Sequence, residues 1–165
     1  MTSWAERSIE ERNLLNPGFC AMLVWQAAQG YASERPLPLS IELSFLVLPF
    51  VLHKETRESL PTNIRTSLPT WLAEHPIVRT RLGERASTLR AFTKESLIFG
   101  GSLGLLAIAQ DGVRANASMK RRVNVALKAT SDEVRDCAKR AEFLGRWLEM
   151  AGGPETVMAL LGVRP

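Results

Sequence analysis

Apolar residues recur at helical spacing over most of the chain. Asn16 and Pro17 are typical of a helix start, as an N-cap and a first helical residue, and the apolar positions after them predict a helix to about Gly30. Ser40 can cap a second helix, which runs to about Leu52 and is apolar on every side. A helix without a polar face is covered by other elements, so we expect this one at the centre of the fold.

The second helix ends in an abrupt change of polarity. Residues 45–52 form the apolar octet FLVLPFVL, and the polar segment HKETR follows directly at 53–57. Pro49 lies inside the octet, where it removes one backbone hydrogen bond and predicts a kink. The run is too short to be a membrane anchor, which needs roughly 20 apolar residues. We interpret it as a kinked core helix that presents HKETR as a polar elbow.

The helical pattern continues to residues 100–101 and then changes to strand spacing. Capping residues and apolar periodicity predict further helices at 67–75, from 76, at about 88–100, from 131 to about 151, and from 154. Between them, LLAIAQDGVRANA at 105–117 places two short apolar runs around Asp-Gly, a pattern typical of a β-hairpin.

These elements predict a mainly α fold, of the α+β class, with one β-hairpin. The 165 residues, 45% of them hydrophobic, suffice for one well-buried core and are too few for two ordinary domains. We therefore expect a single compact domain over 1–165, with a helical part at 1–101, a hairpin wing at about 103–117 and C-terminal helices at about 131–165. Helices followed by a hairpin are the order of a winged-helix domain, so the arrangement is predicted to be winged-helix-like.

Composition adds three expectations. The net charge of +4 permits a polyanionic partner without demanding one. The N-terminus lacks the basic flank and apolar core of a secretion signal, so a cytoplasmic location and no membrane association are expected. Cys20 and Cys137 both fall in apolar helical patterns, which favours buried thiols over a disulfide.

One motif resembles a catalytic one. GGSLG at 100–104 fits the G-x-S-x-G pattern of a hydrolase, with Ser102 as the nucleophile, but that pattern needs a strand before the serine and a helix after it. Here the order is reversed, and His53 and His75 both precede the serine. No metal-ligand spacing and no phosphate-binding loop are present in the sequence either. We predict no enzymatic activity, no metal and no cofactor.

Basic residues cluster at 79–94 and at 120–122. Such clusters are ordinarily solvated faces. In a winged-helix-like fold, however, they would lie on the recognition helix and beside the wing, where phosphate contacts are made. The residues that we single out as possible DNA contacts are Arg90, Lys94, Arg114, Lys120, Arg121 and Arg122.

Four phrases, taken in order, resemble a known family. They are NLLNP at 13–17, LPLSIELSFLVLPFVLHKETRESLP at 37–61, FLGRW at 143–147 and TVMALLGVRP at 156–165. Together they resemble the middle component of bacterial three-component ABC systems, the group that includes the small accessory subunit of Lamassu-type anti-phage defence. The resemblance implies a non-enzymatic subunit that works beside an SMC-like or Rad50-like ABC ATPase and an effector, commonly a nuclease.

The resemblance suggests an adaptor that bridges the ATPase and the effector and reaches DNA mainly through the complex. The residues predicted to contact a partner are His53, Thr56, Arg57, Arg146 and Arg164. Two alternatives stay open: Arg57 and Arg164 can instead brace the fold of the chain itself, and His53 can be a cation favoured by a helix C-terminus. The alternative function is a stand-alone winged-helix DNA-binding regulator.

Overall fold

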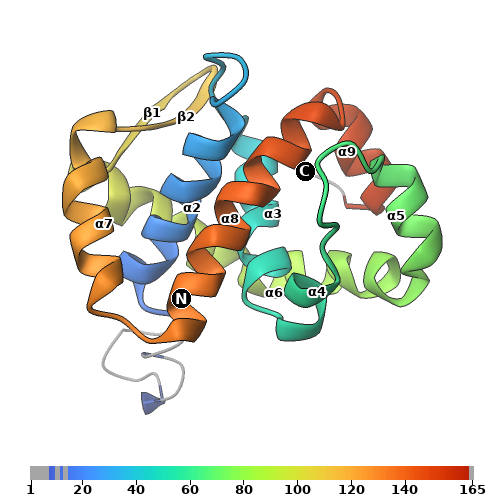
Figure 1. Cartoon of the computed structure of the whole chain (residues 1–165), viewed down its shortest axis with the longest axis horizontal. Helices are drawn as coiled ribbons and strands as arrows, with labels where there is room; N and C mark the ends of the chain where they lie inside the picture. Colours follow the sequence, from blue (N-terminus) through green and yellow to red (C-terminus); the bar gives the residue numbers. More distant parts are fainter. Residues whose placement is uncertain (1–7, 10–11, 13–14, 164–165) are drawn as a thin grey trace.

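The computed structural model describes residues 8–9, 12 and 15–163 of the chain. Within that part, eight α-helices surround a core into which one two-stranded hairpin also packs (Figure 1). The elements are α2 (Pro17–Tyr31), α3 (Ile41–Val51), α4 (Lys54–Ser59), α5 (Leu68–Glu74), α6 (Pro76–Ser102), β1 (Leu106–Ala109), β2 (Gly112–Ala115), the 3-10 helix η2 (Ala117–Met119), α7 (Lys120–Lys128), α8 (Asp132–Met150) and α9 (Pro154–Leu161). The predicted mainly helical fold with one hairpin is confirmed.

Helices α2 and α8 cross at two glycines (Figure 1). A Cβ atom on Gly30 would lie 1.9 Å from the carbonyl oxygen of Glu142, and one on Gly145 would lie 1.9 Å from that of Ala27. No side chain fits at these distances, so only glycine allows the two backbones to come this close. Gly145 is the central residue of FLGRW, so the close helix contact explains why this phrase has a glycine at its centre.

Helix α3 is the central helix that its apolar pattern predicts. Ser40 caps it by accepting a hydrogen bond from the Leu43 N–H, and the buried Pro49 lies inside it. It packs against α2, α6 and α8. None of the described helices is long and apolar enough to cross a bilayer.

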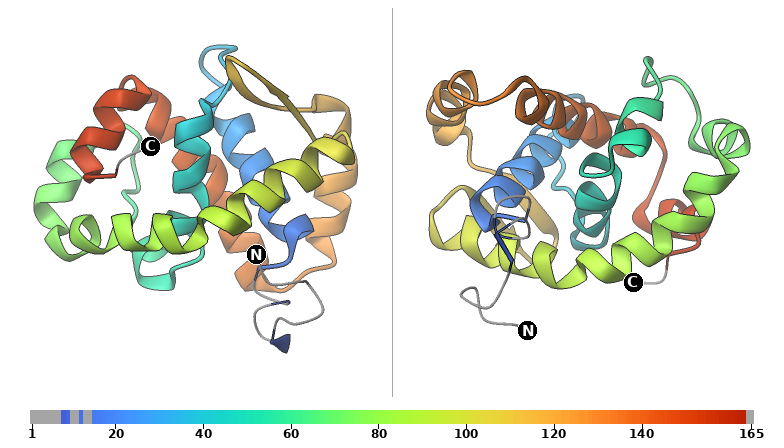
Figure 2. Two further views of the ribbon diagram at one scale, coloured as in Figure 1. Left: turned by 180° about the vertical axis from the view of Figure 1, so that it is seen from behind. Right: turned by 90° about the horizontal axis from the view of Figure 1, so that it is seen from below.

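Helix α6 is one continuous helix where two were predicted. It runs past α3 and α2 along one side of the molecule, as Figure 2 shows from behind. Between Pro76 and Ser102 the sequence has no proline, and the interior Gly83 costs a helix only about 1 kcal/mol relative to alanine. Nothing in the local sequence therefore ends the helix before residue 102.

Three buried aromatic side chains fasten the connector between α4 and α5. Phe50, Trp71 and Trp147 pack with ring centroids 5.3 to 6.4 Å apart. The indole N–H of Trp71 donates to the Ser59 carbonyl and that of Trp147 to the Thr66 carbonyl, each at 2.7 Å. The connector is thus held at both ends by indole groups from the core.

The hairpin is bound to the body of the fold. Strands β1 and β2 pair antiparallel, with Ala109 opposite Gly112. Leu39 then pairs with Val113 through two backbone hydrogen bonds of 3.0 and 2.7 Å, so the connector before α3 lies along β2. Gly112 has a φ of +136°, and a Cβ there would lie 2.4 Å from the Leu39 carbonyl oxygen. The predicted hairpin is confirmed, but the winged-helix-like arrangement is not.

Both cysteines are buried free thiols, as the apolar patterns predict. Burial raises the pKa of Cys20 to about 12. The thiol is therefore protonated at neutral pH and packs as a small apolar group.

Candidate interaction surfaces

The polar elbow HKETR is a helix start that is bound into the fold. His53 is the N-cap of α4: the Thr56 N–H donates to its Nδ1 at 3.3 Å. Arg85 of α6 donates to the Thr56 hydroxyl at 2.7 Å, and that hydroxyl lies 2.9 Å from the same Nδ1. Thr56 is fully buried, whereas the sequence analysis predicts a partner contact for it; that contact stays a prediction.

His53 acts as a neutral cap rather than as a cation. Because Nδ1 accepts the Thr56 N–H, it carries no proton in this arrangement. Burial and the neighbouring Arg85 lower the pKa of His53. The cap therefore contributes fully above pH 6.5, the ordinary pKa of histidine, and is lost as the pH falls through the lowered value.

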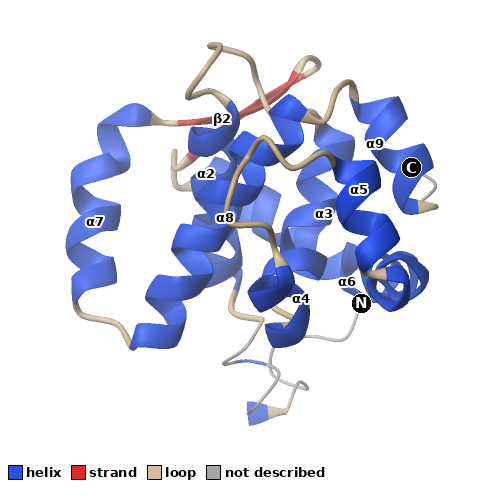
Figure 3. Cartoon of the chain, turned by 45° about the vertical axis from the view of Figure 1, so that its right-hand side comes forward, coloured by secondary structure: helices blue, strands red, loops and turns tan. Residues whose placement is uncertain are grey.

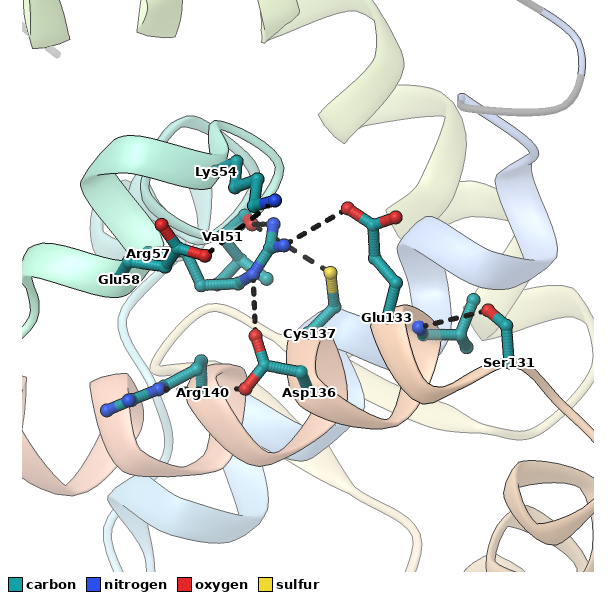
Figure 4. Close-up of polar contacts among 10 residues, drawn as sticks. Val51, Lys54, Arg57, Glu58, Ser131, Glu133, Asp136, Cys137 and Arg140 are labelled. Atoms are coloured by element: carbon teal, nitrogen blue, oxygen red, sulfur yellow. Dashed lines mark hydrogen bonds and ion pairs between the residues drawn. The ribbon is translucent and has the colours of Figure 1, made fainter.

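Arg57 is buried, whereas the sequence analysis predicts an exposed contact. Its side chain is 3% exposed and points at α8 (Figure 4). Nε donates to Asp136 at 2.9 Å, one terminal nitrogen to Glu133 at 3.2 Å, and the other to the Val51 carbonyl at 2.8 Å. Burial alone would lower the pKa of Arg57, but the bonds to Asp136 and Glu133 outweigh it and raise the pKa. The alternative, that Arg57 braces the chain's own fold, fits this geometry.

The other two predicted partner contacts have different positions. Arg146 of α8 donates to Glu34 at 3.2 Å, and its side chain is 40% exposed. Its buried Nε has no hydrogen-bond partner within the described part of the chain. Arg164 lies outside the described residues. A partner contact by either arginine stays a prediction.

An apolar groove of about 420 Å³ lies between α3, α6 and α9, three helices that Figure 3 labels. The side chains of its apolar lining are Ile41, Phe45, Ala86, Met158 and Val163. Glu42 and Arg90 also line it, and neither has an ion-pair partner among the described residues. Two family-like phrases, 37–61 and 156–165, thus meet at this groove.

The groove was not predicted from the sequence, because it depends on where α9 packs. Gly162 ends α9 in the left-handed region, with φ +66°, and the Val163 N–H returns to the Met158 carbonyl at 3.0 Å. This C-cap places Val163 in the lining. A glycine followed by an apolar residue at the end of a helix was the available signal.

The six possible DNA contacts come from three separate elements. Arg90 and Lys94 are exposed on α6, where Arg90 lines the groove. Arg114 in the hairpin is bound by both oxygens of Asp111, at 2.9 and 2.6 Å, which compensates its charge. The remaining three are exposed in the first turn of α7, a helix that was not predicted; they are Lys120, Arg121 and Arg122. Their contact with DNA stays a prediction.

The GGSLG segment has the reversed context that its sequence indicates. Ser102 ends α6, its hydroxyl donates to the Phe99 carbonyl at 2.8 Å, and the strand β1 follows. Nor do three or more His, Cys, Asp or Glu side chains gather as a metal site anywhere in the described ranges. The serine thus has the geometry of a helix end.

Replacing the serine is accordingly expected to change little. In Ser102→Ala, an exposed hydroxyl bonded within its own helix turn is lost, so the free energy of unfolding should change by about 0.5 kcal/mol or less. Urea unfolding of the purified variant measures this. A variant that folds normally but has lost biological activity would contradict the structural role.

Comparison with known proteins assigns the chain to a family. Residues 4–165 match the family model described as ABC-three component (ABC-3C) system Middle Component 3. No curated protein and no solved structure gives a significant match.

Proposed function

Because the chain belongs to the ABC-three component system Middle Component 3 family, we propose that it is a non-enzymatic adaptor subunit of such a complex. In this proposal it bridges an SMC-like or Rad50-like ABC ATPase and an effector such as a nuclease, in an anti-phage system of the Lamassu type. The family description names one component of three, so partner subunits are implied.

The structural feature that supports this proposal is the apolar groove between α3, α6 and α9. Its apolar lining includes Ile41, Phe45 and Val163, which the chain leaves partly exposed. Open apolar pockets with a few polar groups at the rim are typical of binding sites. Glu42 and Arg90 supply opposite charges there, both without a partner among the described residues.

The occupant that we propose is an amphipathic helix of a partner subunit. Its apolar side chains would fill the groove, as anchors on one helix face do in helix-in-groove recognition. A basic residue beside these anchors would pair with Glu42, and an acidic one with Arg90. The two rim charges would thereby fix the direction of the helix in the groove.

The predicted contact residues have two roles in this proposal. We propose that His53, Thr56 and Arg57 act indirectly. Thr56 bonds to α6, and Arg57 bonds to α8 and to the Val51 carbonyl at the end of α3, so they hold α3 in its place. His53 caps the helix that carries both. Arg146, partly exposed, is a proposed direct contact, as is Arg164, which follows the groove residue Val163 in sequence. The stand-alone regulator is the weaker candidate, because the winged-helix arrangement is not confirmed.

A pair of neighbouring substitutions on α6 tests the docking site. Ser87 lines the groove and Thr88, the next residue, does not, although both are exposed. In Ser87→Arg a long charged side chain occupies the groove, so we expect affinity for the partner subunit to fall at least tenfold, or by about 1.4 kcal/mol. Thr88→Arg adds the same charge to the same helix and should bind normally.

The measurement is co-purification of the full chain with the other two components, followed by titration of the partner that it retains. Thermal melting of both variants controls for folding. Equal binding by Ser87→Arg and Thr88→Arg would rule out the groove as the docking site.

A further inference from the structure

A second pocket, formed by other helices, has a different chemistry. It has a volume of about 260 Å³ and lies between α2, α7 and α8, on the side of the molecule where Figure 1 shows α7. The cations in its lining come from α7 and α8 and are Lys120, Lys128, Arg135 and Lys139. This pocket is therefore a concentration of positive charge between three helices.

Most of this charge is not compensated within the chain. The three lysines form no ion pair within the described ranges. Arg135 bonds to Asp132 and to the Thr130 carbonyl, so its charge is partly compensated. Glu142 is the carboxylate of the lining, and it pairs with none of these cations. An excess of positive charge remains.

An unpaired amide in the pocket fits the same kind of ligand. Gln26 of α2 lines the pocket and is 7% exposed, and its side chain has no hydrogen-bond partner among the described residues. Its amide atoms are not among the fully buried polar atoms that lack a partner, so they keep access to solvent and to a ligand. An oxyanion in the pocket would satisfy the Gln26 amide and the lysine ammonium groups together.

We propose that this pocket binds a phosphate group, with the lysines neutralising its charge and the Gln26 N–H donating to one of its oxygens. Phosphate carries more charge and more acceptor oxygens than a carboxylate, which matches several cations around one amide donor. The volume lies below the roughly 300 to 1,000 Å³ of pockets that enclose drug-sized ligands, which favours one compact anionic group over a whole nucleotide inside the pocket. The phosphate can belong to a nucleic-acid backbone or to a free polyphosphate.

The test uses the full chain and two probes, inorganic pyrophosphate and a short DNA duplex, each titrated by calorimetry at fixed low salt. Lys139→Gln should weaken binding about tenfold or more, since it removes one charge-assisted hydrogen bond. Lys54→Gln makes the same change at an exposed lysine of α4, outside the pocket, and should leave the affinity unchanged.

Gln26→Met separates a binding role from a structural one. Methionine keeps the length of the side chain and removes the donor, so binding should weaken several-fold. The melting temperature of the free protein should not fall, because Gln26 has no partner among the described residues. A lower melting temperature with unchanged probe affinity would overturn the assignment.

The remaining outcomes distinguish the two sources of the phosphate or overturn the proposal. Pyrophosphate binding that depends on Lys139 and Gln26 supports the site with a free phosphate as its ligand. Binding of DNA alone, with the same dependence, supports it with the nucleic-acid backbone as its source. The proposal is wrong if neither probe binds, or if Lys54→Gln weakens binding as much as Lys139→Gln does.

Discussion

Gly145→Ala is expected to destabilise the fold by about 4 kcal/mol or more, which is a large part of the roughly 5 to 15 kcal/mol that stabilises a typical domain. A Cβ at this position would lie 1.9 Å from the Ala27 carbonyl oxygen and 2.8 Å from the Tyr31 nitrogen. Both are backbone atoms, so no side-chain rotation can relieve the overlap. Helices α2 and α8 would have to separate, and the core packing between them would be lost.

A second helical glycine is the matched control. Gly101 lies near the end of α6, where the nearest atom to an added Cβ is Cδ1 of Ile108 at an ordinary 3.6 Å. Gly101→Ala should therefore be neutral or stabilise the chain by up to about 1 kcal/mol, the helix propensity difference. Urea unfolding of both variants measures the contrast. Gly145→Ala with a midpoint like that of Gly101→Ala would show that the helices do not meet this closely in solution.

The helices that could be predicted are those whose first turn is capped by a side chain close to it in sequence. Asn16 and Ser40 are the N-caps that the sequence predicts, and Ser67 and Ser131 cap the helices predicted from 67 and 131; each accepts a backbone N–H at the start of its helix. Such bonds join residues two or three positions apart, so the sequence alone contains both partners. The hairpin was predictable for the same reason, because its turn and its two short strands are contiguous in sequence.

The elements that were mispredicted have weak apolar patterns. The buried residues of α6 recur at helical spacing on one face, but Thr93, Ser96 and Gly100 among them are polar or small. The apolar residues alone therefore do not mark this face as continuous, and the pattern imitates a helix boundary near residue 88. Helix α7 buries only Val123 among its residues and has too weak an apolar stripe to be predicted.

The candidate surfaces were the least predictable part, because they combine segments far apart in sequence. Arg57 follows an apolar helix and therefore looked exposed, but its acidic partners lie 76 and 79 residues further along, on α8. The groove likewise needs α9 against α3 and α6, and the phosphate pocket needs α7 beside α8. The sequence shows which side chains are charged. It does not show whether their ion-pair partners belong to the same chain or to another subunit.

Arg57→Met is the second substitution with a large expected effect. Removal of the guanidinium leaves the buried Val51 carbonyl without this donor, and Asp136 and Glu133 without their shared cation. Breaking a fully buried ion pair costs about 3 to 5 kcal/mol, but Glu133 and Asp136 are 69% and 46% exposed and stay partly hydrated. We therefore expect a smaller loss, of about 2 to 3 kcal/mol. In a chain of this size that loss lowers the melting temperature by roughly 4 to 12 °C.

Arg140→Met provides the control on the same carboxylate. Arg140 lies 3.9 Å from Asp136, one helical turn away, in a loose pair with both side chains partly exposed. Pairs of this kind contribute about 0.3 to 0.5 kcal/mol, so the melting temperature should hardly change. If Arg57 braces the fold, Arg57→Met melts early and still binds its partner subunit when both are mixed at low temperature. If Arg57→Met instead melts like Arg140→Met and no longer binds the partner, Arg57 must leave its acidic partners to contact the other subunit, and the exposed role first predicted for it is correct.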